Sequence, residues 1–87
     1  MRQISYTSHD YKPVCVVPVI ASFDTEGHVV PLYVRIEGES CRVNSFWIKS
    51  DCTNVIQYNC QIMNHDTIRP VQLSYYQDET IWTIPAR

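Results

Sequence analysis

The sequence predicts an all-β fold: a single small antiparallel meander barrel of six strands, SH3-like in character, with a two-layer β-sandwich as the alternative. Composition is the first reason. Valine, isoleucine and threonine number 25 of the 87 residues and ten more are aromatic, whereas leucine and alanine number four. Branched and aromatic side chains suit a pleated surface better than a helix. The second reason is that turn signals at near-even intervals separate short apolar runs.

Six runs are the expected strands: 14–23, 29–36, 40–49, 55–63, 67–76 and 80–84. The clearest turn between them begins with Asp24 and ends with Gly27, which is the composition of a type I turn. Weaker signals occupy 37–39, 50–54, 64–66 and 77–79. Such short connections join antiparallel neighbours, because a parallel pair needs a long crossover.

Alternation with a period of two assigns the faces of these strands. The side chains expected to point inward are Val30, Leu32, Val34 and Ile36 in the second run, Ile56, Tyr58, Cys60 and Ile62 in the fourth, and Val71, Leu73 and Tyr75 in the fifth. The first run is apolar on both faces, so we expect it to be central in the sheet or covered on both sides. Alternation fails at 43–46, which indicates a bulge. Prolines 18, 31 and 70 are expected at edges, bulges or strand starts.

The organisation expected is a polar N-terminal arm over residues 1–12 and one barrel domain over 13–87. The first residues have no apolar core typical of a signal peptide. The longest apolar stretch, 14–23, is about half of what spans a bilayer. We therefore expect a cytoplasmic protein that is not a membrane protein, with its four cysteines reduced.

Charge and spacing argue against several functions. A net charge of −2 without a basic stripe argues against duplex DNA. The four cysteines and three histidines are enough ligands for a zinc site, but no Cys-x-x-Cys knuckle occurs, and Cys60, close to His65, alternates with core residues. No metal or other cofactor is therefore expected, and structural zinc is the third interpretation. No nucleophile and base are placed to meet, and two glycines leave no phosphate-binding loop. We expect the protein not to be an enzyme.

One face of the fourth and fifth runs is polar without being charged. Its side chains are Gln57, Asn59, Gln61, Gln72, Ser74 and Tyr76. Protein interfaces are depleted in charge at their centre, and amides cost less to desolvate than ions. The expected function is a non-catalytic protein–protein interaction module, with another protein or a second copy of the chain as partner. An ordinary solvated face has the same pattern.

The alternative is a small barrel that binds single-stranded nucleic acid through exposed aromatic and cationic residues. Tyr33, Arg35 and Trp47 are the candidates, since bases stack on aromatic rings beside a cation. The net negative charge disfavours this alternative, and so does the frequent burial of tryptophan in small domains. The sequence does not say whether Trp47 and Trp82 are exposed.

Three local patterns also occur together: Phe23-Asp24 followed by Gly27, Pro31-Leu32 followed by Arg35, and Trp82 in the last strand. In these features the chain resembles a group of small uncharacterised bacterial β-barrel proteins with an F-D-x-x-G hairpin, a P-L-x-x-R motif and a C-terminal strand containing tryptophan. The resemblance covers most of residues 12–84. It implies a small barrel often encoded in bacterial genomes and mobile elements, and it carries over no catalytic residues.

Overall fold

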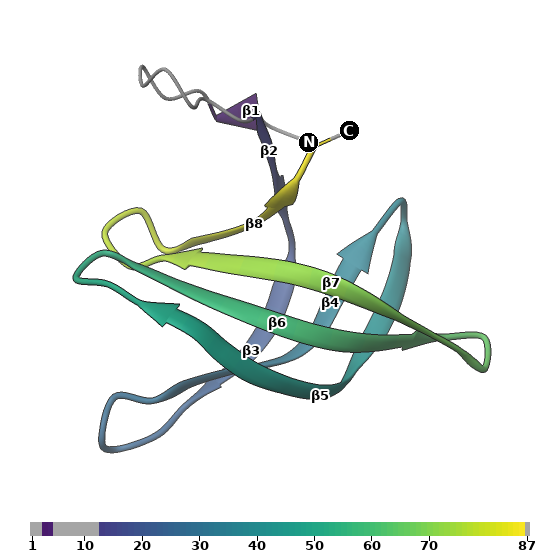
Figure 1. Ribbon diagram of the computed structural model, residues 1–87, viewed down its shortest axis with the longest axis horizontal. Helices are drawn as coiled ribbons and strands as arrows, with labels where there is room; N and C mark the ends of the chain where they lie inside the picture. Colours follow the sequence, from purple (N-terminus) through teal and green to yellow (C-terminus); the bar gives the residue numbers. More distant parts are fainter. Residues whose placement is uncertain (1–2, 5–12, 87) are drawn as a thin grey trace.

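The computed structural model describes residues 3–4 and 13–86, which form one antiparallel β-sheet (Figure 1). Its strands are β1 (Gln3–Ile4), β2 (Val14–Val17), β3 (Val19–Phe23), β4 (Val29–Ile36), β5 (Glu39–Asp51), β6 (Val55–Asn64), β7 (Thr67–Tyr76) and β8 (Ile81–Pro85). Their order in the sheet is β1-β2-β8-β7-β6-β5-β4-β3. The sequence-based prediction of an all-β antiparallel fold is confirmed.

The sheet curls into a half-barrel because one chain segment serves both of its ends. β2 pairs with β8, β3 pairs with β4, and only Pro18 separates β2 from β3. At this junction the Arg35 backbone N–H donates to the Pro18 carbonyl at 3.0 Å. In Figure 1 the long strands β5, β6 and β7 cross the molecule near the viewer, and the β2–β3 segment passes behind them.

The number of strands differs from the prediction. Proline has no N–H to donate to a ladder, so the expected strand 14–23 is divided at Pro18 into β2 and β3. A two-residue strand, β1, is added beside β2. The arm expected over residues 1–12 lies outside the described residues, apart from Gln3 and Ile4.

The core is built from the inward residues of β6 and β7 together with parts of the other strands. The buried apolar side chains are Val17, Val34, Ile36, Cys41, Ile56, Tyr58, Cys60, Ile62, Leu73, Tyr75 and Trp82. The predicted inward face of β6 is therefore confirmed in full. No described residue lies in a helix long and apolar enough to cross a membrane.

Alternation in β4 is interrupted where the prediction assumed it was regular. Tyr33 pairs with Ile20 but Pro31 pairs with Ala21, so Leu32 is an extra residue in the ladder. Residues of β4 that precede this bulge therefore point to the side of the sheet opposite to the one predicted. Pro31 is buried and Leu32 is exposed. The prediction that Leu32 points inward and Pro31 outward was wrong.

The expectation that the first run is central or covered on both sides was wrong for its second half, β3, whereas β2 lies between β1 and β8. β3 is the last strand of the sheet, and its Ile20 and Phe23 are 62% and 61% exposed. The three prolines do lie where their missing N–H predicts. Pro18 is at the bend, Pro31 at the bulge, and Pro70 in the part of β7 for which β6 is the one partner among the described strands.

β5 has two irregularities in its pairing with β6. One falls between Val43 and Ser45, where the sequence predicts a bulge, and the other between Ile48 and Ser50. Bulges bend a strand and increase its twist. They allow this 13-residue strand to curve around the half-barrel.

Candidate functional site

The polar residues predicted to bind a partner do lie together on the convex face of β6 and β7. Gln57 pairs with Ser74, Asn59 with Gln72, and Gln61 with Pro70. Most of these side chains are half-buried, as is Tyr76 at the end of β7. Ser74 is 8% exposed, so it offers a partner little surface. We call this convex side of strands β3–β7 the outer face.

Trp47 stands on the outer face beside these amides. It pairs with Asn59, and its side chain is 52% exposed. Trp82, in contrast, is buried: its side chain is 6% exposed and packs against Tyr75 with ring centroids 4.8 Å apart. Sequence alternation alone did not separate the two tryptophans, because the bulges of β5 decide where Trp47 points.

A second feature of the outer face is a row that crosses five strands. Consecutive register pairs connect Ile20 to Tyr33, Tyr33 to Arg42, Arg42 to Met63, and Met63 to Ile68. Ile20, Tyr33 and Ile68 are all exposed. Sequence reasoning missed this row, because its members are far apart in the chain and only strand register brings them together.

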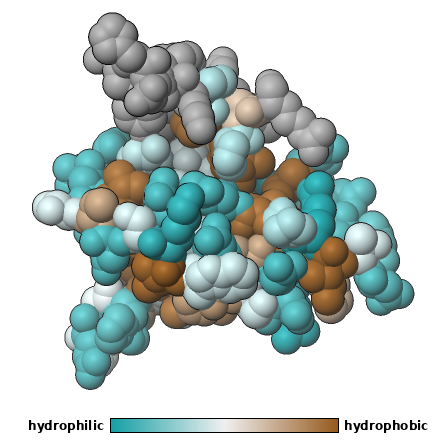
Figure 2. Space-filling view, in the orientation of Figure 1, coloured by the Kyte–Doolittle hydropathy of each residue, from teal (hydrophilic) through white to brown (hydrophobic). Residues whose placement is uncertain are grey.

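Charge is distributed unevenly between the outer face and the rest of the described chain. Every described carboxylate lies in a turn or at a strand end: Asp24, Glu26, Glu37, Glu39, Asp51, Asp66, Asp78 and Glu79. The outer face carries Arg35 and Arg42, which lie near the turn between β4 and β5. In Figure 2, which shows the side toward the viewer in Figure 1, hydrophilic and hydrophobic side chains are interspersed over these strands.

The residues of the nucleic-acid alternative are exposed but not all adjacent. Tyr33 and Arg35 line one small cleft of about 130 Å³ with Ile20 and Ser40. Trp47 lies further along β5 than Arg42, the residue that pairs with Tyr33. The structure therefore brings two of the three candidates together, with Arg42 as an additional cation beside them.

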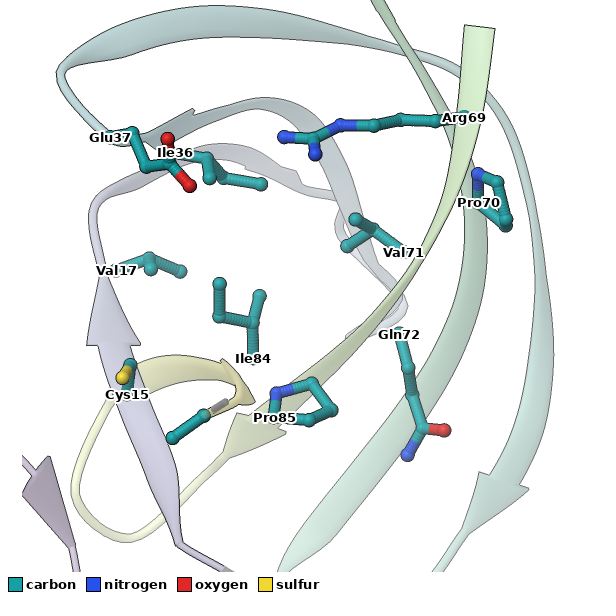
Figure 3. A pocket seen from close by; sticks show the side chains of 11 residues that line it. Cys15, Val17, Ile36, Glu37, Arg69, Pro70, Val71, Gln72, Ile84 and Pro85 are labelled. Atoms are coloured by element: carbon teal, nitrogen blue, oxygen red, sulfur yellow. The ribbon is translucent and has the colours of Figure 1, made fainter.

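A cavity of about 410 Å³ opens where β8 leaves β7 to pair with β2 (Figure 3). Its wall is mostly apolar, with Val17, Val71 and Ile84 directed into it. Glu37 and Arg69 lie at one end. These two side chains carry opposite charges.

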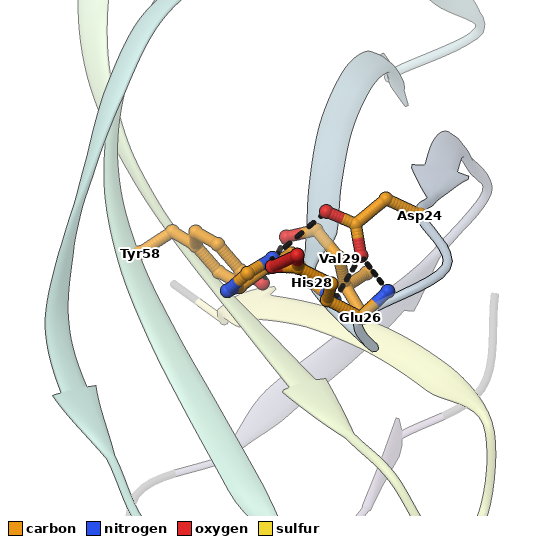
Figure 4. Close-up of polar contacts among 5 residues, drawn as sticks. All are labelled: Asp24, Glu26, His28, Val29 and Tyr58. Carbon is orange, nitrogen blue, oxygen red and sulfur yellow. Dashed lines mark hydrogen bonds and ion pairs between the residues drawn. The ribbon is translucent and has the colours of Figure 1, made fainter.

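A third hollow, of about 230 Å³, lies between β4 and β5, and we call it the β4–β5 cleft. Its lining includes Val29, Phe46, Ile48 and Tyr58. The Tyr58 hydroxyl donates to the Val29 carbonyl at 2.6 Å and so joins β6 to β4 across the cleft (Figure 4). Burial, together with the charge of Asp51, raises the pKa of Tyr58 to about 12, so this hydroxyl keeps its proton at neutral pH.

Two exposed carboxylates, Asp24 and Glu39, accept hydrogen bonds from residues in or beside turns. One oxygen of Asp24 accepts the backbone N–H groups of Glu26 and His28, and the other contacts His28 Nδ1 at 2.8 Å (Figure 4). These hydrogen bonds hold the pKa of Asp24 below its usual value. Glu39 likewise contacts Asn64 and His65, and its pKa is lowered mainly by the Asn64 amide. Both pairs are exposed.

The cysteines are all free thiols, and Cys41 and Cys60 are buried. Burial raises the pKa of Cys60 to about 11, so its thiol is protonated and a poor nucleophile at neutral pH. Within residues 3–4 and 13–86, no three histidine, cysteine or carboxylate side chains are grouped closely enough to hold a metal ion.

Searches of protein-family models, of curated proteins and of solved structures gave no match to this chain.

Proposed function

We propose that the protein is a non-catalytic protein–protein interaction module, built on an SH3-like barrel, that docks its partner on the outer face. The observation that carries the proposal is the exposure of Trp47, Tyr33 and Arg42 on one sheet face among uncharged polar side chains. A cytoplasmic, cofactor-free role belongs to the same proposal. It suits a chain that resembles small uncharacterised bacterial β-barrel proteins.

The chemistry of this face favours association over plain solvation. Tryptophan, tyrosine and arginine are the residue types that most often dominate binding energy at interfaces. Here each is exposed, and amides such as Asn59 and Gln61 surround Trp47 without adding charge that must be desolvated. Because the charged side chains beside Tyr33 on this face are Arg35 and Arg42, the partner surface is expected to be neutral or acidic.

The test compares Trp47→Glu with a matched aromatic control, Phe23→Ala. Phe23 is equally exposed, but its ring lies on the concave side against Tyr75, with centroids 6.1 Å apart. Self-association is measured by sedimentation of the purified protein, and partner capture by affinity purification with mass spectrometry. Loss of a dimer or of a specific partner in Trp47→Glu alone is expected. Identical behaviour of wild type and Trp47→Glu in both assays would refute the proposal.

A second candidate function is binding of single-stranded nucleic acid. It is favoured because Tyr33 pairs with Arg42 and lines one small cleft with Arg35, so an exposed ring lies beside two cations. Fluorescence anisotropy with an oligo(dT) probe at low salt distinguishes the candidates. Binding that weakens with salt and with Trp47→Ala supports the second, and no binding at low salt rules it out.

A further inference from the structure

β4 and β5 are paired over half of β4 and less than a third of the 13-residue strand β5. Four residue pairs join them, from Tyr33–Arg42 to Ile36–Glu39, next to the turn that connects the two strands. β4 continues outward to pair with β3, while β5 continues to Asp51 with β6 as its one partner among the described strands. The two strands therefore diverge, and each has a free edge toward the β4–β5 cleft.

The cleft has an apolar floor that is open to solvent. Phe46 and Ile48 pair with Cys60 and Tyr58, which are core residues, so their side chains lie on the concave side of the sheet. Both remain exposed because none of the described strands covers them on the β4 side. On this side the hydrogen bond from the Tyr58 hydroxyl to the Val29 carbonyl connects β6 to β4.

Two bulges fix how much of the β5 edge is regular. The register of β5 shifts between Val43 and Ser45 and again between Ile48 and Ser50. Ser45–Ile48 lies between these shifts and keeps an uninterrupted ladder to β6. A flat, unpaired strand edge is a template for pairing with another chain, and bulges end such pairing. The available edge is thus about four residues long.

Asp51 and His28 line the cleft directly. The carboxylates of the hairpin between β3 and β4 lie beside His28: its Nδ1 is 2.8 Å from Asp24 and 4.0 Å from Glu26. Asp51 is the exposed carboxylate at the apolar floor. Lys49 and His28 are the basic side chains on the same segments. Negative charge beside an apolar floor suits a cation on an aliphatic stem.

We propose that the β4–β5 cleft binds an extended segment of a partner protein, which adds as a short strand to the Ser45–Ile48 edge of β5. The segment has apolar residues at alternate positions, to cover Phe46 and Ile48, and a lysine or arginine that pairs with Asp51. Main-chain hydrogen bonds supply affinity in this mode, and alternate side chains supply specificity. The proposal concerns the concave side and does not depend on the outer face.

The test uses two synthetic octapeptides with alternating valine and threonine, one containing an arginine near its end and one with glutamate in its place. Amide chemical shifts and hydrogen exchange are followed by NMR in the full-length protein. We expect the arginine peptide to shift and protect amides of Ser45–Ile48 and of Val29–Val30. The glutamate peptide is expected to bind more weakly.

Three variants make the result specific. Asp51 is exposed, so Asp51→Asn should weaken binding of the arginine peptide about two- to fivefold, which is the range of an exposed ion pair. Ile48→Lys should weaken both peptides about tenfold or more by charging the apolar floor. Ile68→Ala, an exposed site on β7 away from the β5 edge, should leave peptide binding unchanged. Shifts confined to other strands, equal binding of the two peptides, or no shifts at millimolar peptide would overturn the proposal.

Discussion

Thr80 shows how a single residue can hold strain in an otherwise regular turn. Its φ is 55°, in the left-handed region that a β-branched residue rarely adopts. Thr80 ends the turn between β7 and β8, and its hydroxyl contacts the Glu79 carbonyl of the same exposed turn. Glycine adopts this conformation without steric cost.

We therefore expect Thr80→Gly to raise the free energy of unfolding by about 1 kcal/mol. Urea denaturation followed by tryptophan fluorescence measures it. Thr25→Gly is the matched control: Thr25 lies in the β3–β4 turn at negative φ, so glycine there should destabilise slightly through chain entropy. A Thr80→Gly protein less stable than wild type would contradict this account.

Alternation of apolar and polar residues predicted burial correctly where strand pairing is regular, and wrongly where a bulge interrupts the pairing. Ile56, Cys60 and Ile62 were assigned correctly because β6 pairs with β7 without interruption. Leu32 was not, because the bulge beside Ala21 depends on β3, and alternation within one strand carries no information about its neighbour's register. The exposure of Trp47 was left open for a similar reason.

At the scale of elements, turns were the most predictable feature because their chemistry is local. The hairpin from Phe23 to Val29 is an example, since Asp24 satisfies the backbone N–H groups of Glu26 and His28 and so fixes the loop. The divergence of β4 from β5 and the row from Ile20 to Ile68 were not predictable. They depend on which strands pair and for how long.

The hairpin predicts how the stability of the protein depends on pH through Asp24. The pKa of Asp24 is lowered in the folded protein, mainly by the hydrogen bond from the backbone N–H of His28. The contribution of Asp24 to the free energy of unfolding is therefore present above pH 3.8, the usual pKa, and is lost as the pH falls below that value. Asp24→Ala should lower the melting temperature at neutral pH, and wild type and variant should converge in acid. Asp24→Asn, which keeps one acceptor oxygen, should lie between them. A constant difference between wild type and Asp24→Ala at every pH would argue against the linkage.

At the scale of the whole molecule, Tyr58 links the core, the half-barrel and the cleft. Its ring packs against Phe46 and Trp82, at centroid distances of 5.8 and 5.5 Å, and its hydroxyl joins β6 to β4. Desolvation raises the pKa of Tyr58 from 10.0 to about 12 and that of Cys60 from 9.0 to about 11. Folding thus favours the protonated form of both groups.

Because both folded pKa values are raised, the stabilisation is fully present below the unfolded values and disappears as pH rises through the folded ones. We expect the free energy of unfolding to be level up to about pH 9 and to fall steadily toward pH 12, as measured by urea titrations at successive pH values. Tyr58→Phe should cost about 1 kcal/mol at neutral pH by removing the bond to Val29. The same change should make the alkaline decline shallower, since only Cys60 of the two then titrates. An equally steep decline in Tyr58→Phe would mean that the half-barrel opens in alkali through groups other than the tyrosine that bridges its cleft.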